Sequence, residues 1–454
     1  MITLTCQGCG VRLKPKEGTL SKRAKCPRCG ARIEATETPV ALSEPTPPAL
    51  PQSPSKVDPH DAKAVMRALL SGFTGTVSRR RPTWGYRITL LFTAIALCLL
   101  LLVYIALIAG AGYGVYWYAI TVLPTGFHFR GRAGVFLLVA HAAVLISGVL
   151  LVFSMIAPLF TRTEDDDDGM TVSPSEAPVL HSFVAKLSEV LGAPKPVEIR
   201  LMLSPNASAG YRGGMWGLLR KQLVLTIGGP LLAGMTTQQI AGVIAHELGH
   251  FSQGGGMLLN HFVMQMARWF ALAASTQQGF SNAMADSDGD DHAIVAIFRF
   301  VFWLTQLLGS LVFWGFALVG LALSMFVSRR QEFDADRYEA EIAGSSAFFG
   351  TTRRMIELAL GESLIFQRGA GAILATLNEA GGVENLASEV VAAADLLAEE
   401  SAPVIEAALQ APTGWLDSHP GIRDRVQAVR ARPQPGLFAV KLPGYALYPR
   451  FNPN

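Results

Sequence analysis

Long apolar runs dominate the pattern of hydrophobic and polar positions along this 454-residue chain. The runs at 88–111 and 134–160 each exceed the roughly 20 residues that a helix needs to cross the hydrocarbon core of a membrane. Two later runs, 257–274 and 293–327, contain more polar side chains. We predict transmembrane helices at all four, with a buried amphipathic hairpin as the alternative for the last two.

Shorter patterns between and after these runs predict helices around a small sheet. Residues 177–191 carry apolar side chains at i, i+3 and i+4, as one face of a helix requires, whereas 197–203 and 222–227 are strand-like. Residues 328–430 have a mainly helical pattern. The proline-containing residues 431–454 predict an irregular tail.

The amino-terminal residues 1–33 contain two C-x-x-C pairs at the spacing of a four-cysteine zinc ribbon. Four thiolates close a tetrahedral site, so this zinc would be structural, and so short a segment needs the metal in order to fold. A disulfide pair or a redox motif is the alternative, which a cytoplasmic location disfavours. Residues 34–60 predict a disordered, proline-rich linker, and 61–87 a juxtamembrane segment. The predicted ribbon ligands are Cys6, Cys9, Cys26 and Cys29.

His246, Glu247 and His250 form an H-E-x-x-H motif on a predicted helix. Residues four apart lie on one face of a helix, so both imidazoles can point at a single zinc ion. Glu247 could then act on a water bound at that ion, as the general base of a metallopeptidase does. A helix with two surface histidines is the alternative.

A hydrolytic zinc site needs a third protein ligand and one open position. One subclass has glycine and histidine where this chain has Gln253 and Gly256, so a third histidine is excluded here. Glu332 is the better candidate, because it shares a helix face with Asp336, which could accept the free ring N–H of a ligating histidine. A helix with solvated acidic side chains is the alternative.

Composition and charge indicate where such a site would lie. Half of the residues are hydrophobic, 16% are charged and the mean hydropathy is +0.33, which is typical of a membrane protein. Arginines precede the first run, at 79–81 and 87, and follow the last, at 329–330, whereas the loop before the last run is acidic. The positive-inside rule therefore predicts an inner (plasma) membrane protein with its amino terminus, metal site and carboxyl terminus in the cytoplasm. Arg130 and Arg132, in the first outer loop, weaken this argument.

The H-E-x-x-H motif and the segment from Glu332 to Asp336 resemble motifs of the integral-membrane zinc peptidases that include HtpX and the CAAX prenyl endopeptidases. The matching segments are 246–250, 332–336, 206–210 and 418–420. The resemblance covers residues 160–430. It implies a mainly α multi-pass membrane protein with a zincin-like α+β metalloprotease domain in two parts, 161–256 and 328–430.

The resemblance also implies roles for residues outside the zinc-binding motifs. Asn206 and Ala207 would lie on an edge strand that pairs with the substrate backbone, although Ser208 replaces an aromatic residue of the family. His419 would lie near the active site and stabilise the transition state, although Gly421 replaces the family's second proline. Capping of the following helix is the alternative for His419.

Together these features predict a zinc metalloendopeptidase with one catalytic and one structural zinc. The resemblance further implies that its substrates are membrane or misfolded proteins. One alternative is an inactive scaffold that docks partners through its ribbon, but the complete set of catalytic residues argues against it. Another is a dedicated prenyl-protein processing protease, but four spans would not enclose the large chamber that seven could. The ribbon is basic without interleaved aromatic residues, so a protein partner fits it better than nucleic acid.

Overall fold

A computed structural model shows that the chain forms two compact units, Met1–Pro47 and Pro48–Asn454. The structure describes residues 4–5, 12–13, 24–25, 32–33, 57–77, 83–124, 131–160, 169–212, 222–252, 262–263, 266, 269, 293–369, 373, 376–377, 382–414, 417 and 419–452.

The described residues of the first unit form two short antiparallel hairpins. Their strands are β1 (Leu4–Thr5), β2 (Arg12–Leu13), β3 (Ala24–Lys25) and β4 (Arg32–Ile33). β1 pairs with β2 and β3 with β4, so each hairpin brackets one C-x-x-C pair in the sequence. The predicted zinc ligands lie outside the described residues, and the ribbon stays a prediction; they are Cys6, Cys9, Cys26 and Cys29.

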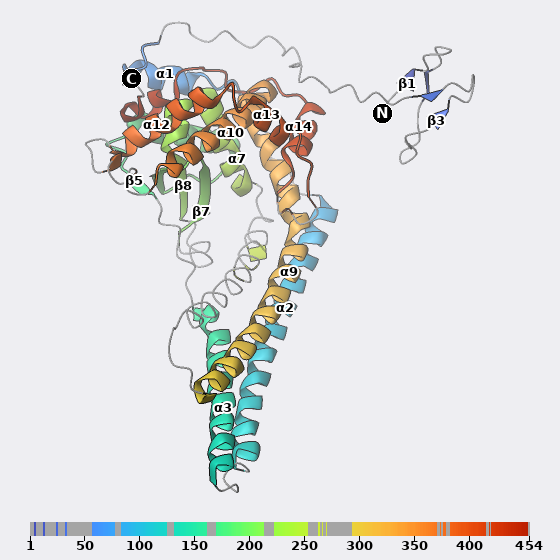
Figure 1. Ribbon diagram of the computed structural model, residues 1–454. Coiled ribbons are helices and arrows are strands. Elements are labelled where there is room, and N and C mark those ends of the chain that lie inside the picture. The colour runs from blue at the N-terminus through green and yellow to red at the C-terminus, as the bar shows by residue number, and fades with distance from the viewer. Residues whose placement is uncertain are drawn as a thin grey trace. The chain divides into compact units, whose positions relative to one another are not determined.

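Within the described part of the second unit, three helices are long and apolar enough to cross a membrane. They are α2 (Trp84–Trp117), which continues into the π-helical turn η1 (Tyr118–Val122), α3 (Gly131–Phe160) and α9 (Ala293–Ala343). Figure 1 shows these three helices packed side by side. The predicted spans 88–111, 134–160 and 293–327 fall within them, which confirms their helical, apolar character.

The predicted span 257–274 lies largely outside the described residues. Four of its residues are described, and two of these show where it packs. Val263 is fully buried in the apolar cluster that contains Phe313 of α9. Trp269 packs edge-on against Tyr104 of α2, with ring centroids 5.3 Å apart. Part of this segment therefore contacts α2 and α9 at mid-helix positions.

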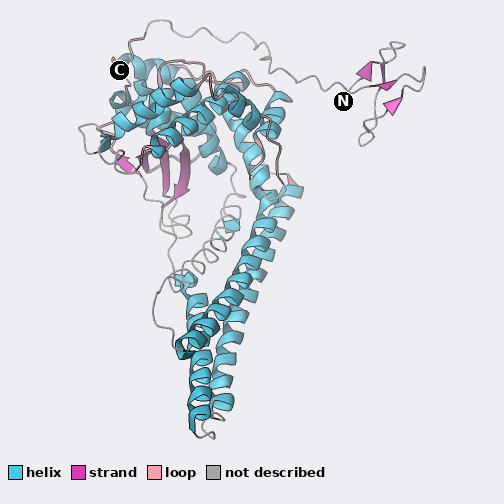
Figure 2. Cartoon of the chain, in the orientation of Figure 1, coloured by secondary structure: helices cyan, strands magenta, loops and turns pink. Residues whose placement is uncertain are grey.

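The sheet of the second unit has four strands in the order β5-β6-β8-β7 (Figure 2). Their bounds are β5 Met170–Val172, β6 Glu198–Met202, β7 Ala207–Tyr211 and β8 Leu223–Gly228. The central pair, β6 and β8, is parallel, and both outer pairings are antiparallel. β7 is therefore an edge strand of the described sheet.

Helices α4 (Pro178–Leu191) and α7 (Thr237–Ser252) share one hydrophobic core with the sheet. The apolar side chains of α4 recur at i, i+3 and i+4 and are buried, as its sequence pattern predicts. Gly192 ends α4 in the left-handed conformation, with φ at 64°. Other helices of the described residues are α6 (Gly229–Gly234), α10 (Ser345–Gln367), α12 (Gly382–Leu397), α13 (Ala402–Leu409) and α14 (Ile422–Arg430).

Two terminal segments are more deeply packed than their sequence patterns suggest. Helix α1 (Ala62–Ser71), expected only as a lead into the membrane, buries Val65 and Leu69 in the main core. The tail forms the 3₁₀ turns η4 (Gly444–Leu447) and η5 (Pro449–Phe451), and it buries Phe438 in the same core. The tail contains only short 3₁₀ turns, yet it packs as an integral part of the main core of the second unit.

Candidate metal centre

Helix α7 begins with a reciprocal pair of hydrogen bonds between Thr236 and Gln239. The backbone N–H of Thr236 donates to Gln239 Oε1 at 2.9 Å, and that of Gln239 donates to Thr236 Oγ1 at 3.3 Å. Ile240, Ile244 and Leu248 then point into the core and are almost fully buried. These apolar positions fix the rotation of α7 and so direct the opposite, motif-bearing face towards α9.

Two glycines let α9 approach α7 closely. A Cβ atom at Gly249 would lie 2.9 Å from Tyr338 Cδ2, and one at Gly242 would lie 3.1 Å from Glu339 Cγ. Real Cβ atoms essentially never approach a neighbour at 2.9 Å, so the contact at Gly249 requires glycine. This close packing brings Glu332 of α9 to the two histidines of α7.

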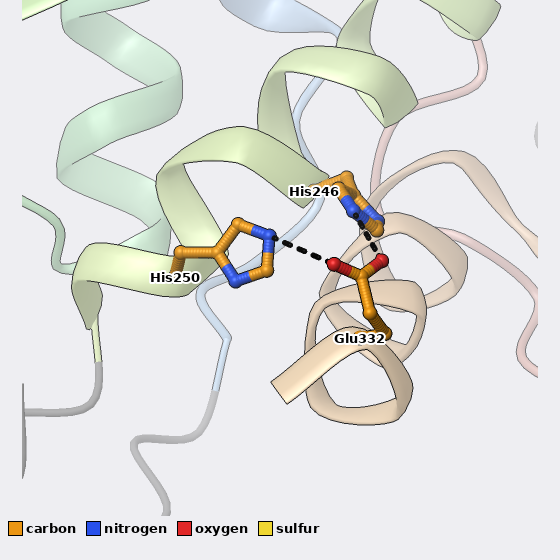
Figure 3. A group of neighbouring side chains, drawn as sticks. All are labelled: His246, His250 and Glu332. Atoms are coloured by element: carbon orange, nitrogen blue, oxygen red, sulfur yellow. Dashed lines mark ion pairs between the residues drawn. The ribbon is translucent and has the colours of Figure 1, made fainter. Parts of the chain in front are cut away.

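His246, His250 and Glu332 converge, and Figure 3 shows both imidazole rings turned towards the carboxylate. His246 Nε2 lies 3.5 Å from Glu332 Oε2, and His250 Nε2 lies 4.0 Å from Glu332 Oε1. One donor atom from each residue falls within 4.8 Å of the other two. Two imidazoles and one carboxylate are a donor set that suits zinc, so the residues fit the predicted ion.

The protonation tendencies of the two histidines also suit a cation site. Burial lowers the pKa of His250 to about 4, which keeps its ring neutral, the form that binds metal. Burial opposes protonation of His246 as well, but the carboxylates of Asp336 and Glu332 outweigh it and raise the pKa of His246 well above its usual value. A position where carboxylates favour a proton on an imidazole also favours a metal cation.

The second nitrogen of His246 faces buried carboxylates on α9. Nδ1 lies 3.3 Å from Asp336 Oδ1 and 3.7 Å from Glu339 Oε2. The Asp336 contact has the distance of an ion pair but not the angle of a hydrogen bond. Arg425 of α14 donates to both oxygens of Asp336, with Nε 2.9 Å from Oδ2. The carboxylate behind His246 is therefore held by a cation from another helix.

Glu247 lies between the histidine motif and the sheet. The backbone N–H of Ala209, on edge strand β7, donates to Glu247 Oε2 at 3.2 Å. Burial raises the pKa of Glu247 to about 7, with His246 acting in the opposite direction. A carboxylate of this kind can exchange a proton near neutral pH, as a general base must.

Asn206 precedes β7 and is exposed, while Ala207 is the first residue of the strand and is buried. Asn206 Oδ1 accepts a hydrogen bond from the backbone N–H of Ala207 at 2.9 Å. Backbone bonds between Asn206 and Gly228 and between Arg212 and Gln222 set the pairing with β8. Ala207 and Ala209 therefore direct their backbone groups away from β8, towards the open edge.

His419 also reaches the centre. Its Nδ1 lies 3.0 Å from Glu332 Oε1, although two thirds of the His419 side chain is exposed. The N-terminal neighbour of α14 is Gly421, and no side-chain cap is formed there, so the geometry does not support the helix-capping alternative for His419.

The structure thus brings together every predicted residue of the catalytic centre that it describes. Sequence reasoning missed Glu339 and Arg425. Glu339 follows Glu332 by seven residues and Asp336 by three, so the helical period alone could have identified it. Arg425 contacts Asp336 across 89 residues of sequence, and no local pattern marks it.

Comparison with known proteins agrees with this geometry. The model of peptidase family M48 matches residues 174–433, more than half of the chain. A protease HtpX homolog from Gemmatimonas aurantiaca is 25% identical over 264 residues, which cover 58% of this chain and 78% of the relative.

Two other relatives match over shorter stretches. A protease HtpX homolog from Moorella thermoacetica is 33% identical over 177 residues, covering 38% of this chain and 53% of the relative. Protease HtpX from Shewanella frigidimarina is 27% identical over 175 residues, covering 38% of this chain and 56% of the relative. The chain thus spans about half the length of these two relatives. No solved structure matches the chain.

The matched region begins just before α4 and ends just after α14, so it contains the H-E-x-x-H helix, Glu332 and His419. The chain belongs to peptidase family M48.

Proposed function

We propose that this protein is a zinc-dependent endopeptidase of the membrane that cleaves membrane or misfolded proteins at the cytoplasmic face. The convergence of His246, His250 and Glu332 within 4.8 Å carries the proposal. Three protein ligands leave one tetrahedral position open, as hydrolytic zinc sites do. Membership of family M48 and the HtpX names of the relatives support the same activity.

Zinc held by these three residues would supply Lewis acidity for the hydrolysis of a peptide carbonyl. Glu247 accepts the proton of the attacking water at its carboxylate and passes it to the leaving amine. Asp336 orients His246 from the Nδ1 side. His419, 3.0 Å from Glu332, extends from the exposed side of the site, where it can donate to the developing oxyanion.

The edge of β7 that faces away from β8 is the outer edge of the described sheet, and it suits an extended substrate. Its outward N–H groups, at Ala207 and Ala209, are satisfied by side-chain oxygens of Asn206 and Glu247. A substrate strand can replace these side chains as the hydrogen-bond partner, and its binding would release Glu247 to accept a proton from water. Backbone pairing of this kind tolerates many sequences, which suits the cleavage of misfolded proteins.

The proposed cytoplasmic setting depends on the arginines at 79–81, 87 and 329–330. The proposed ribbon zinc, held by the four amino-terminal cysteines, is structural, and the ribbon serves a protein partner rather than nucleic acid.

The experiment is cleavage of an unfolded model protein in detergent by the purified full-length chain. We expect wild-type cleavage to stop when a chelator is added and to return with zinc. Glu247→Gln should retain its metal and lose at least about 100-fold of the activity, as the loss of a general base does. Glu189→Gln, an exposed carboxylate on α4, is the matched control and should cleave normally. Wild-type protein that carries zinc but cleaves nothing would favour the scaffold instead.

A further inference from the structure

His419 lies on the segment between α13 and α14, and burial does not hold it in place. Two thirds of its side chain is exposed, yet its Nδ1 lies 3.0 Å from Glu332 Oε1. An exposed side chain on a connecting segment loses rotational and backbone freedom when it is held at such a distance. Contacts elsewhere in the segment must therefore fix the backbone that presents His419.

Arg329 makes such contacts from α9. Its Nε donates to the backbone carbonyl of Asp417 at 2.9 Å, and its Nη2 donates to that of Gly414 at 2.9 Å. Asp417 precedes His419 by two residues. The guanidinium is a rigid planar fork, so two bonds to one segment fix its orientation as well as its distance.

Helix α9 carries both residues that contact the segment around His419. Arg329 and Glu332 are three residues apart on α9 and therefore lie on neighbouring positions of the same face. The arginine holds the backbone before His419, and the glutamate meets the His419 ring. Because α9 is continuous here, the segment is positioned directly against the residue that we propose as third zinc ligand.

Bonds within the segment complete its framework. Gly414 N–H donates to Asp417 Oδ2 at 2.6 Å, which links the two residues whose carbonyls Arg329 contacts. At the other end, Gly421 N–H donates to Thr413 Oγ1 at 2.8 Å, and Thr413 N–H donates to Asp424 Oδ2 of α14 at 3.1 Å. The segment is thus tied to α14 by Asp424 and to α9 by Arg329.

From this geometry we infer that Arg329 is a positioning residue for the peptidase reaction, which acts by placing His419 at the zinc site. The inference rests on the proposed function. It assigns to Arg329 no contact with substrate or metal. The neighbouring Arg330 differs from Arg329, because its side chain is exposed and forms an ion pair along its own helix with Asp334, at 3.5 Å.

The test is a double-variant cycle on the purified full-length protein, with kcat, KM and zinc content measured for each variant. We expect Arg329→Gln and His419→Ala each to lower kcat by tenfold or more, since displacement of a catalytic group by roughly 1 Å can cost about 100-fold. KM and zinc content should change less than twofold. Arg330→Gln is the matched control and should leave all three quantities unchanged.

The combined variant distinguishes positioning from general stability. If Arg329 acts through His419, Arg329→Gln should lower kcat by less than twofold in the His419→Ala background. A full tenfold loss in that background would overturn the inference, and so would normal activity of His419→Ala. Arg329→Lys should recover part of the activity, because one ammonium can still reach one of the two carbonyls.

A second variant covers the case in which Arg329→Gln folds poorly. Asp417→Ala removes the hydrogen bond between Gly414 and Asp417 without altering α9, and it should produce the same loss of kcat and the same non-additivity with His419→Ala. Additive losses for this variant would also count against the inference. Retained cleavage by Glu247→Gln would instead reject the proposed peptidase mechanism, so the two failures are distinguishable.

Discussion

At the scale of single residues, His246 joins two groups of carboxylates. Nε2 faces Glu332 and the proposed zinc position, whereas Nδ1 faces Asp336 and Glu339. Asp336 is completely buried, and Arg425 compensates its charge from α14. The orientation of the first proposed zinc ligand therefore depends on a buried ion pair between two helices.

Arg425→Met should destabilise the protein strongly, because it leaves the buried Asp336 carboxylate without its cation. Breaking a buried pair by removing one partner costs about 3–5 kcal/mol. Thermal or denaturant unfolding in detergent measures the change. Arg423→Met is the matched control on the same helix: its side chain is 44% exposed, and an exposed pair contributes about 0–1 kcal/mol. Equal stability of the two variants would contradict the importance of the buried pair.

Glu332→Ala should remove the catalytic zinc, because two imidazoles alone bind the ion weakly. Metal analysis of the full-length protein should then give one zinc per chain, held by the ribbon, against two in the wild type. Asp334→Ala is the control, since this partly exposed carboxylate lies two residues away and points to another face of α9. Two zinc ions per chain in Glu332→Ala would reject Glu332 as a ligand.

Sequence spacing was sufficient to predict which site residues of one helix share a face. It was insufficient to predict which residues of different helices come together. The four-residue interval between Glu332 and Asp336 predicts a shared face, and the structure directs both towards His246. Arg425 and Arg329 act on partners that are 89 and 85–88 residues away. Their importance arises from tertiary packing, which a single sequence does not encode in any local period.

At the scale of elements, the site is a consequence of how closely α7 and α9 pack. The capping pair at Thr236 and Gln239 fixes the start of α7, and its buried apolar positions fix its rotation. The H-E-x-x-H motif placed this helix in the sequence. The packing of α1 and of the tail was not predictable from the sequence, because Phe73 and Phe438 meet with ring centroids 4.6 Å apart across most of the chain. A helix that precedes the first span thereby becomes part of the catalytic domain.

Gly249→Ala should separate the two helices that hold the proposed zinc ligands. The added Cβ would lie 2.9 Å from Tyr338 Cδ2 and 3.1 Å from Tyr338 Cβ, so α9 must shift or Tyr338 must leave its position. Overpacking of this kind costs about 1–3 kcal/mol. We expect lower stability and weaker zinc retention during titration with a chelator.

Gly350→Ala in α10 is the matched control for that variant. Its Cβ would meet Gln239 Nε2 at an ordinary 3.6 Å, and alanine favours a helix over glycine by roughly 0.5–1 kcal/mol. The control should therefore be neutral or slightly stabilising. Normal zinc retention in Gly249→Ala would show that the site does not depend on this close approach.

At the scale of the whole molecule, one shared core restricts the number of membrane crossings. Helices α1, α4 and α7 bury their apolar faces in the same cluster, so all three lie on one side of the membrane. The two candidate spans α2 and α3 lie between α1 and α4 in the chain, and two crossings are consistent with this. Between α7 and the end of α9, however, the described residues contain one candidate span, α9. An even number of membrane crossings between α7 and Glu332 is needed for Glu332 to lie beside α7.

The residues before α9 should therefore provide a fourth crossing. Helix α9 has 51 residues and is ~76 Å long, so it can cross a ~30 Å hydrocarbon core and still carry Glu332 well beyond it. In the preceding segment, Val263 lies in the apolar cluster that contains Phe313 of α9, and Trp269 packs against Tyr104 near the middle of α2. These contacts support insertion of that segment into the membrane beside α2 and α9, rather than a position outside it.

Cysteine labelling in intact cells tests this arrangement. A fourth crossing puts Ser287, which precedes α9, on the outer face, so Ser287→Cys should react with a membrane-impermeant maleimide before lysis. Ser175→Cys, at an exposed position before α4, should react only after lysis if the site lies on the cytoplasmic side, as we propose. Wild-type protein sets the background. Protection of both positions until lysis would mean that residues before α9 do not cross, and α9 would then have to lie against the membrane rather than span it.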